Sequence, residues 1–313
     1  MHSISANDIG IGYETAKWIA MMGATVIIAC RSQERAQNAI ERMKTEFQAE
    51  KDKHTEGISE TDTLHVEFMQ VDLASLRSVK SFIEEFRSSG RQLHTLICNA
   101  GIAMHPQHYT EDDNELMFQV NYLSHFLIAA HFIPIMKKSG DDCRIINVSS
   151  EAIKVATFDI STIQGKQSTP ENFDRLNYYG RSKLYQIMQM YKLNRCLQGS
   201  NITVSSIHPG IVETEINRSF TDLGRWKVFF GLSKLIGVTK TPFEGARTTI
   251  NVAVNPQLAG IRDVYYSDCK PASTVPIARK LENQEALWEY SKERLKDYLP
   301  EEVIKELEDN TPI

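Results

Sequence analysis

Short runs of apolar residues alternate along this chain with longer segments in which apolar residues recur at helical spacing. Val, Ile and other apolar residues fill nearly every position of the short runs, which predicts strands that are buried on both faces. Such strands are typical of a parallel sheet with helices on both sides, so the pattern predicts an α/β fold with a doubly wound parallel sheet. The predicted strands span residues 25–30, 65–71, 95–98, 144–148, 203–208 and 263–266.

Two segments fall outside this alternation. Residues 50–63 are charged and polar and predict a surface loop that extends a helix. Residues 278–307 carry apolar side chains at helical spacing, which predicts an amphipathic helix docked on the body, with a partner-binding helix as the alternative. Because no internal repeat occurs, we expect one domain over residues 1–313, of which residues 278–313 form a C-terminal helical extension. The apolar positions of this extension are Leu287, Trp288, Leu295 and Leu299.

Composition adds limits on function rather than on fold. With 313 residues, 42% of them hydrophobic, the chain is long enough for a large core. A formal net charge of -5 gives no reason to expect nucleic acid as a partner. The five cysteines include no C-x-x-C pair and no signal segment precedes them, which predicts a reducing, cytoplasmic location. No run of about 18 consecutive apolar residues occurs, so nothing in the chain as written is predicted to span a membrane.

Two glycines stand just before the first predicted helix, which starts near Tyr13. Gly10 and Gly12 would let the backbone approach a pyrophosphate at the helix N-terminus, where unpaired N–H groups favour negative charge. Gly10, Ile11 and Gly12 are therefore candidates for holding a dinucleotide. A tight turn without a ligand is the alternative.

Tyr179 and Lys183 lie four residues apart in a predicted helix and therefore share a face. An ammonium near a phenol favours the ionised form and lowers the pKa of the phenol. A phenol with a lowered pKa can exchange a proton with a substrate hydroxyl or carbonyl at neutral pH. The pair thus predicts acid–base chemistry, against the alternative of a solvated helix face.

Further polar residues follow the predicted strands. Ser149 and Ser150 end one strand, and Asn99, Ala100 and Gly101 follow another. Asn121 lies in the next helix, and Pro209, Gly210 and Thr214 follow a later strand. Open α/β sheets bind ligands at the carboxyl ends of their parallel strands, so we expect these residues to gather at one site.

With this set of motifs, the sequence resembles the short-chain dehydrogenase/reductase family over essentially its whole length, which implies a Rossmann-like sheet. The stretch Ala29-Cys-Arg31, the segment that begins at Asp72 and the late stretch from Tyr266 make it similar to the retinol dehydrogenases. The same stretches are similar to the oxidoreductase domain of the WW-domain-containing oxidoreductase, which an Asn-Arg-Ser motif at Asn217 slightly favours.

The resemblance implies a role for each matching residue. Tyr179 would be the general acid/base, and Lys183 would lower its pKa and hold the nicotinamide ribose. Ser150 would bind the reacting oxygen, and Asn121 would anchor a proton-relay water. The implied cofactor-binding residues are Gly10, Ile11 and Gly12 at the pyrophosphate, Asp72 at the adenine, Asn99, Ala100 and Gly101 along the adenosine ribose, and Pro209, Gly210 and Thr214 at the nicotinamide.

Arg31 ends the second predicted strand, where NAD-binding members of the family usually carry an acidic group for the ribose 2′-hydroxyl. An arginine there would instead meet a 2′-phosphate. We therefore expect NADP as the cofactor, with NAD as the alternative if Arg31 is only an exposed, solvated side chain.

The beginning of the chain departs from the family pattern. The family starts with a full apolar strand and T-G-x-x-x-G-I-G, whereas here Ser5 and Ala6 take the first two turn positions and only Met1 to Ile4 precede them. We therefore expect a truncated first strand that leaves the strands around Val26 and Leu96 partly open, and a loosely held phosphate turn. A misplaced start or a splice variant would explain this, and a missing segment could carry WW domains or a membrane anchor.

The most aromatic stretch lies between Thr214 and Pro242, where family members place a substrate lid. An apolar lid predicts a lipophilic alcohol or carbonyl substrate such as a retinoid or steroid. A core helix is the alternative, and peripheral membrane contact, with Arg225, Lys227 and Lys234 at its rim, is a third. The apolar residues are Phe220, Trp226, Val228, Phe229, Phe230, Leu232, Leu235 and Ile236.

Two functions therefore stand side by side. The first is an oxidoreductase that transfers a hydride between NADP(H) and a lipophilic alcohol or carbonyl. The second is a catalytically impaired interaction protein that keeps the dehydrogenase fold; intact Tyr179, Lys183, Ser150 and Asn121 argue against it, and the altered first turn argues for it. A homodimer is compatible with either function.

Overall fold

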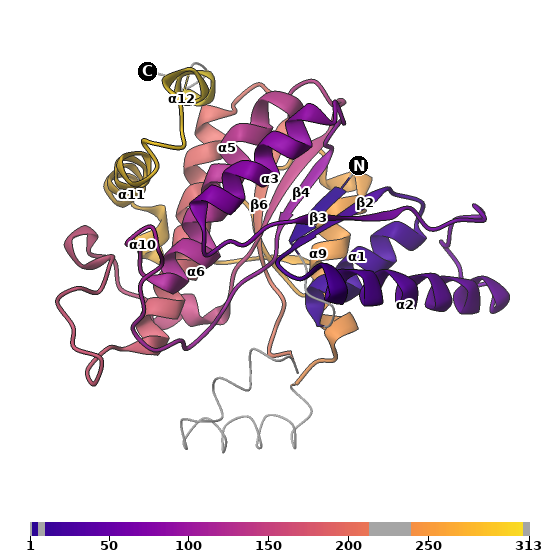
Figure 1. Cartoon of the computed structure of the whole chain (residues 1–313), viewed down its shortest axis with the longest axis horizontal. Helices are drawn as coiled ribbons and strands as arrows, with labels where there is room; N and C mark the ends of the chain where they lie inside the picture. The colour runs from indigo at the N-terminus through magenta and orange to yellow at the C-terminus, as the bar shows by residue number, and fades with distance from the viewer. Residues whose placement is uncertain (1, 6–9, 213–238, 309–313) are drawn as a thin grey trace.

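The computed structural model describes residues 2–5, 10–212 and 239–308. Its centre is an eight-stranded sheet with the order β3-β2-β1-β4-β5-β6-β7-β8 (Figure 1). The strands from β1 to β7 pair in parallel, and β8 is antiparallel to β7. The strands are β1 His2–Ser5, β2 Val26–Cys30, β3 Val66–Gln70, β4 Thr95–Cys98, β5 Cys143–Val148, β6 Ile202–His208, β7 Tyr265–Ser267 and β8 Lys270–Ala272.

Helices cover both faces of this sheet, as the hydrophobic pattern predicted. The first group is α1 Ile11–Met21, α2 Gln33–Asp52 and α9 Pro242–Val254, and the opposite group is α3 Leu76–Ser88, α5 Ser124–Met136 and α6 Arg175–Cys196 (Figure 1). Successive residues of a strand pack into hydrophobic cores on opposite faces of the sheet. Ile27 packs into the core under α3, α5 and α6, and Ile28 into the core under α1, α2 and α9. The period of two along a strand thus produces two cores on one sheet. The doubly wound α/β fold is confirmed.

The strand predictions hold to within about two residues at each end, apart from β8. That strand of three residues, Lys270–Ala272, follows a tight turn in which Asp268 and Cys269 have φ of 52° and 60°. The sequence analysis missed it because neither turn residue is a glycine and the strand is short.

The expectation of open edges beside the first strand is wrong. Strand β1 is short, but it pairs with β2 from His2 to Ser5 and with β4 from His2 to Ile4. The strands on either side are themselves only five and four residues long. Four residues are therefore enough to pair Val26 and Leu96 with the middle of the sheet.

The C-terminal part is docked on the body, but as three helices rather than one. They are α10 Pro276–Arg279, α11 Leu281–Arg294 and α12 Glu301–Glu308. Helix α11 ends at a turn around Leu295, and Pro300, which has no N–H to donate, precedes α12. All four predicted apolar positions are buried, and the Trp288 ring meets Phe126 of α5 edge-on, with ring centroids 4.9 Å apart.

One helical stretch among the described residues, Leu116–Met136, is long and apolar enough to cross a membrane. Within the fold, 94% of its apolar window is buried. It comprises α4 Leu116–Phe118, the π-helical turn η1 Gln119–Leu123 and α5. Its apolar character is therefore accounted for by its place between the sheet, α3 and the C-terminal helices.

Candidate active site

The predicted site residues gather at the carboxyl edge of the sheet. Ser150 lies two residues past β5, Gly101 three residues past β4, and Gly210 two residues past β6. Because these strands are parallel, all three ends meet at the same edge. Helix α6 contributes Tyr179 and Lys183 from one side, and the π-helical turn η1 contributes Asn121.

Helix α6 is held close to the strand edge. Asp174 caps its start by accepting a hydrogen bond from the Asn177 N–H. Gly180 follows Tyr179, and a Cβ there would lie 2.4 Å from the carbonyl oxygen of Ala152. Glycine is therefore required for α6 to pack against the 3-10 turn η2 Glu151–Val155, which is capped at its N-terminus by Ser150. This packing brings Tyr179 and Ser150 together.

Tyr179 is buried, and its side chain is hydrogen-bonded to Ser150. Burial raises the pKa of Tyr179 above its ordinary value, because the phenolate is less well solvated inside the protein, and the Ser150 hydrogen bond lowers it in part. In the chain alone the net shift is upward and the lowering contact comes from Ser150, so the role expected of Lys183 in lowering this pKa stays a prediction.

Lys183 turns toward β5 instead. Its ammonium donates to the Val148 carbonyl oxygen at 2.9 Å, and burial lowers the pKa of Lys183 to about 8. A Cβ on Gly101 would lie 3.0 Å from both Lys183 Nζ and Asn121 Oδ1. The absent side chain at Gly101 thus allows Lys183 and Asn121 to lie close to the backbone that follows β4.

Asn121 is locked in place by the turn that carries it. In η1 the Ser124 N–H bonds to the Gln119 carbonyl, five residues back, which widens the helix. The Asn121 side chain donates to Ile102 O and to Ser182 Oγ, both at 2.8 Å, and accepts from the Ile102 N–H at 2.8 Å. The amide therefore connects the end of β4 to the face of α6.

The backbone carbonyl of Asn121 also has protein partners. It accepts a hydrogen bond from Gln186 Nε2 at 2.8 Å, and Nδ1 of His125 lies 3.2 Å from it. Burial lowers the pKa of His125 to about 4, so this ring is neutral at physiological pH. The sequence analysis missed Gln186 and His125, which carry no motif apart from their helical spacing from Lys183 and Asn121.

At the other end of the site, the phosphate turn is described from Gly10 onward. Gly10 precedes α1 with φ of 86°, a conformation that favours glycine, and as the N-cap residue it has no side chain with which to cap the helix. The first N–H groups of α1 therefore have no side-chain acceptor from the N-cap residue, which fits an anion-binding helix start. Ser5 pairs with Ala29 of β2 through its backbone, and Ala6 lies outside the described residues.

Two predicted nucleotide contacts sit beyond this turn. Arg31 is exposed, and its carbonyl accepts from Gln70 Nε2 at 3.3 Å. Asp72 is partly buried and accepts a hydrogen bond from the Ala74 N–H at 2.9 Å. The structure thus places Arg31 at the end of β2, with its side chain open to solvent, and Asp72 just past β3.

The predicted nicotinamide end contains an unforeseen lysine. Gly210 has φ of 92°, and a Cβ there would lie 2.7 Å from Lys240 Nζ. The same ammonium donates to the Pro209 carbonyl at 3.2 Å and pairs with Asp268. Lys240 comes close because Val212 and Lys240 form a parallel bridge. Thr214, Asn217 and the predicted lid residues lie outside the described part of the chain.

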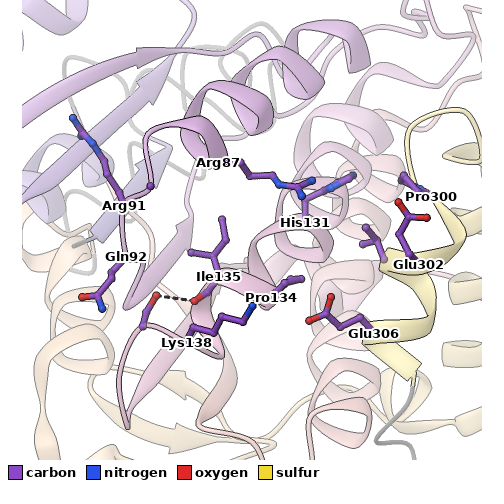
Figure 2. A pocket seen from close by; sticks show the side chains of 13 residues that line it. Arg87, Arg91, Gln92, His131, Pro134, Ile135, Lys138, Pro300, Glu302 and Glu306 are labelled. Atoms are coloured by element: carbon purple, nitrogen blue, oxygen red, sulfur yellow. Dashed lines mark hydrogen bonds between the residues drawn. The ribbon is translucent and has the colours of Figure 1, made fainter.

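One cavity of about 420 Å³ lies elsewhere, between α3, α5 and α12 (Figure 2). Its wall includes Arg87, His131 and Glu302, together with residues that precede β4 and β5. It therefore opens at the amino edge of the sheet, opposite the predicted site. Among residues 2–5, 10–212 and 239–308, no group of three His, Cys, Asp or Glu side chains could hold a metal ion.

Comparison with known proteins agrees with this geometry. The family model described as short chain dehydrogenase matches residues 4–223. Retinol dehydrogenase 14 of Homo sapiens is 36% identical over 289 residues, which cover 92% of this chain and 84% of that protein. The WW domain-containing oxidoreductase of Gallus gallus is 34% identical over 304 residues, covering 95% and 68%. Polyprenol dehydrogenase of Homo sapiens is 33% identical over 295 residues, covering 92% and 82%.

The fold itself also has close counterparts among solved structures. An uncharacterised protein from Mycobacterium paratuberculosis superposes with a TM-score of 0.71 at 24% identity, over 94% of this chain and 92% of its own. At that identity the match supports the fold alone.

Proposed function

This chain belongs to the short chain dehydrogenase family of NAD(P)-dependent oxidoreductases, and from that premise we propose that it transfers a hydride between NADP(H) and a lipophilic alcohol or carbonyl compound. The observation that carries the proposal is the hydrogen bond between Tyr179 and Ser150 at the carboxyl edge of the sheet. A phenol and a hydroxyl in contact can together hold one substrate oxygen and move one proton.

In this proposal, the chain's residues divide the work. Tyr179 gives a proton to the carbonyl oxygen during reduction and removes one from the hydroxyl during oxidation. Ser150 holds the same oxygen, and Asn121 fixes the face of α6 through Ser182. The nicotinamide ring supplies the hydride chemistry when bound. Because burial alone raises the pKa of Tyr179, an added positive charge near the phenol is needed to bring it toward neutrality.

Lys183 is the residue that we assign to the ribose. Its ammonium lies close to the Gly101 backbone, and we propose that a ribose hydroxyl takes the place of the Val148 carbonyl as its acceptor. With a pKa of about 8, Lys183 remains largely protonated at pH 7. We further assign Gly10, Ile11 and Gly12 to the pyrophosphate, Asp72 to the adenine, Asn99 to Gly101 to the adenosine ribose, and Pro209, Gly210 and Thr214 to the nicotinamide end.

NADP, rather than NAD, is our proposal for the cofactor. Arg31 directly follows β2 and is exposed, so its guanidinium can reach a 2′-phosphate without losing a partner within the described residues. An acidic residue at this point would favour the free 2′-hydroxyl of NAD. NAD remains the alternative.

The substrate class rests on the relatives. One is named a retinol dehydrogenase and another a polyprenol dehydrogenase, and both names specify long apolar alcohols. We propose a substrate of this class, and keep peripheral membrane contact, a homodimer and a cytoplasmic location as predictions. The rival function is an interaction protein with the same fold and no turnover.

The test is reduction of all-trans-retinal by NADPH with the purified chain, followed by loss of NADPH absorbance. A parallel NADPH fluorescence titration reports binding. Turnover supports the proposal. Binding without turnover for retinal and for a polyprenal-type aldehyde favours the interaction protein, and absence of binding rejects the cofactor assignment.

A further inference from the structure

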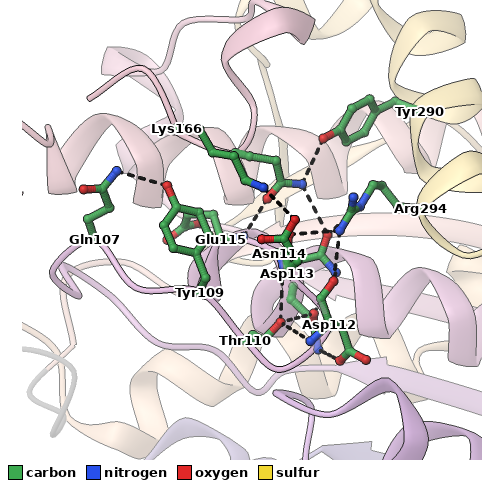
Figure 3. Close-up of polar contacts among 12 residues, drawn as sticks. Gln107, Tyr109, Thr110, Asp112, Asp113, Asn114, Glu115, Lys166, Tyr290 and Arg294 are labelled. Carbon is green, nitrogen blue, oxygen red and sulfur yellow. Dashed lines mark hydrogen bonds and ion pairs between the residues drawn. The ribbon is translucent and has the colours of Figure 1, made fainter. Parts of the chain in front are cut away.

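A buried polar network joins the C-terminal helix α11 to the turn that carries Asn121. Arg294 and Tyr290 lie one turn apart on α11 and face the loop before α4 (Figure 3). Arg294 Nε donates to Asn114 Oδ1 at 2.8 Å, and Arg294 Nη2 donates to the carbonyls of Asp112 and Asp113, each at 2.9 Å. One guanidinium thus fixes three acceptors in a single loop.

Asn114 connects Arg294 to η1 by hydrogen bonds to both. Its side chain is fully buried; Oδ1 accepts from Arg294 and from Gln164 Nε2, and Nδ2 donates to Gln119 Oε1 at 2.8 Å. Gln119, also fully buried, accepts a second hydrogen bond from Thr110 Oγ1 at 2.7 Å and donates to Asp112 Oδ2 at 2.8 Å. Every polar atom of the Gln119 amide therefore has a partner in the loop that α11 holds.

Gln119 is also the residue on which the wide turn depends. Its carbonyl accepts the five-residue hydrogen bond from Ser124 that defines η1, and Asn121 lies two residues further on. A π turn inside a helix has one residue more than a regular turn, so its position must be fixed by contacts outside the helix backbone. The Gln119 amide provides such contacts.

A second set of hydrogen bonds, made by Glu115 and Gln164, holds the start of α4. The buried Glu115 caps α4 by accepting from the N–H groups of Met117 and Phe118, at 3.0 and 2.7 Å. Its own N–H donates to Gln164 Oε1 at 2.6 Å, and Gln164 also donates to Tyr290 Oη at 2.9 Å. Helix α11 therefore reaches the start of α4 by two routes, through Asn114 and through Gln164.

We propose that Asn114, Gln119 and Arg294 form a clamp through which α11 sets the position of the π turn and so places Asn121 against Ser182 in the helix of Tyr179 and Lys183. These three are positioning residues, since none of them reaches Tyr179 or Ser150 directly. Only the expected effect of the clamp on turnover rests on the proposed function. The placement of Asn121 itself is a structural claim.

The sharpest test is Asn114→Asp, which keeps the shape of the side chain and its bond with Arg294. It replaces the donor to Gln119 Oε1 by a second acceptor. If the Gln119 amide rotates to donate to the new carboxylate, its oxygen then faces Asp112 Oδ2, so one repulsive contact remains in either orientation. We expect kcat to fall about tenfold, as a small misplacement of a reacting constellation does, with the NADPH dissociation constant within about twofold of wild type.

A readout independent of turnover is hydrogen exchange of the peptide that covers residues 119–124. We expect exchange there to become about tenfold faster in Asn114→Asp, with little change in α3. If Asn114→Asp does not fold, Arg294→Ala provides the same test from the exposed side of the clamp. The matched control is Lys292→Met, which removes ion pairs with Glu289 and Glu308 from the same helix without touching the clamp.

The clamp is rejected if exchange of residues 119–124 in the folded variant equals that of wild type, or if Lys292→Met accelerates it equally. Because the exchange experiment needs no substrate, the clamp can be confirmed or rejected even if the wild-type chain shows no turnover. A wild-type enzyme that turns over while Asn114→Asp keeps the full kcat overturns the catalytic part of the inference and leaves the proposed function standing.

Discussion

The two ends of the proposed cofactor site are built differently. At the phosphate end, α1 starts from Gly10 without a side-chain cap and Arg31 is exposed. At the catalytic end, Tyr179, Lys183 and Asn121 are buried, and hydrogen bonds connect each of them to another element. The phosphate end thus offers the first N–H groups of α1 and the Arg31 guanidinium to a ligand. The side chains of the catalytic end already have hydrogen-bond partners within the chain.

This difference indicates which property each end controls. A preorganised catalytic end loses little freedom during the reaction, so changes there should act on kcat. An open phosphate end gains its contacts only when a ligand binds, so changes there should act on affinity and on cofactor preference. The following predictions test that separation, beginning with the largest effect.

Tyr179→Phe should lower kcat by about a thousandfold, because it removes the transferable proton and keeps the ring. The NADPH dissociation constant should stay within about threefold, since the phosphate end is untouched. Steady-state kinetics and fluorescence titration check both values. Activity within tenfold of wild type would remove Tyr179 from the catalytic role.

The raised pKa of the buried Glu115 should make the free energy of unfolding depend on pH. Burial raises its pKa to about 7, although the N–H groups of Met117 and Phe118 and the charge of Arg181 oppose this. Its pKa is thus higher in the folded than in the unfolded chain. The free energy of unfolding should therefore fall as pH rises from about 4.5 to about 7, by about 3 kcal/mol at most.

The check is urea unfolding at pH 5 and pH 8 for wild type and Glu115→Gln. Wild type should lose more stability between the two pH values than the variant, because glutamine does not ionise. The same pH dependence in both proteins would show that Glu115 keeps an ordinary pKa.

Gly180→Ala should lower stability by about 2 kcal/mol and kcat at least about tenfold, because the new Cβ would force α6 away from Ala152 and Ser150. Alanine is otherwise the better helix former by about 1 kcal/mol. A loss of stability in this variant would therefore come from the clash with Ala152. Gly260→Ala is the matched control: its φ of 73° strains the backbone, but no atom lies within 4 Å of the new Cβ. Equal kcat values for the two variants would contradict the close packing of α6.

Arg31→Asp should have the smallest effect, and only on cofactor choice. Replacing the cation by a carboxylate should weaken NADPH binding about tenfold relative to NADH, with kcat at saturating cofactor nearly unchanged. Competitive titration with the two cofactors measures the ratio. An unchanged ratio would mean that the Arg31 side chain does not meet the 2′ position.

The sequence predicted the sheet well because each strand is buried on both faces and therefore reads as an apolar run. It also predicted the positions of Ser150, Tyr179 and Asn121 in the fold, since each belongs to a motif at a strand end or in an adjacent helix. Their catalytic roles stay predictions. Lys240 could not be predicted, because its approach to Gly210 depends on a bridge between Val212 and Lys240, which lie far apart in the sequence. The raised pKa of Tyr179 was equally out of reach, because it results from burial, which helical spacing does not reveal.

The first strand is as short as predicted, but its expected consequence, open edges on the neighbouring strands, was wrong. Four residues are enough because the neighbouring strands have only five and four residues themselves. The clamp on Asn121 also escaped notice, because Asn114, Gln119 and Arg294 come together only after α11 has folded back onto the loop before α4.

The most direct test of the account is to follow the hydride itself. NADPH deuterated at C4 on both faces is incubated with the purified wild-type chain and with all-trans-retinal, and the alcohol is analysed by mass spectrometry. The account predicts an alcohol that is one mass unit heavier, with no such product from Tyr179→Phe. If NADPH binds but neither retinal nor a polyprenal-type aldehyde takes up deuterium, the chain is not the oxidoreductase proposed here.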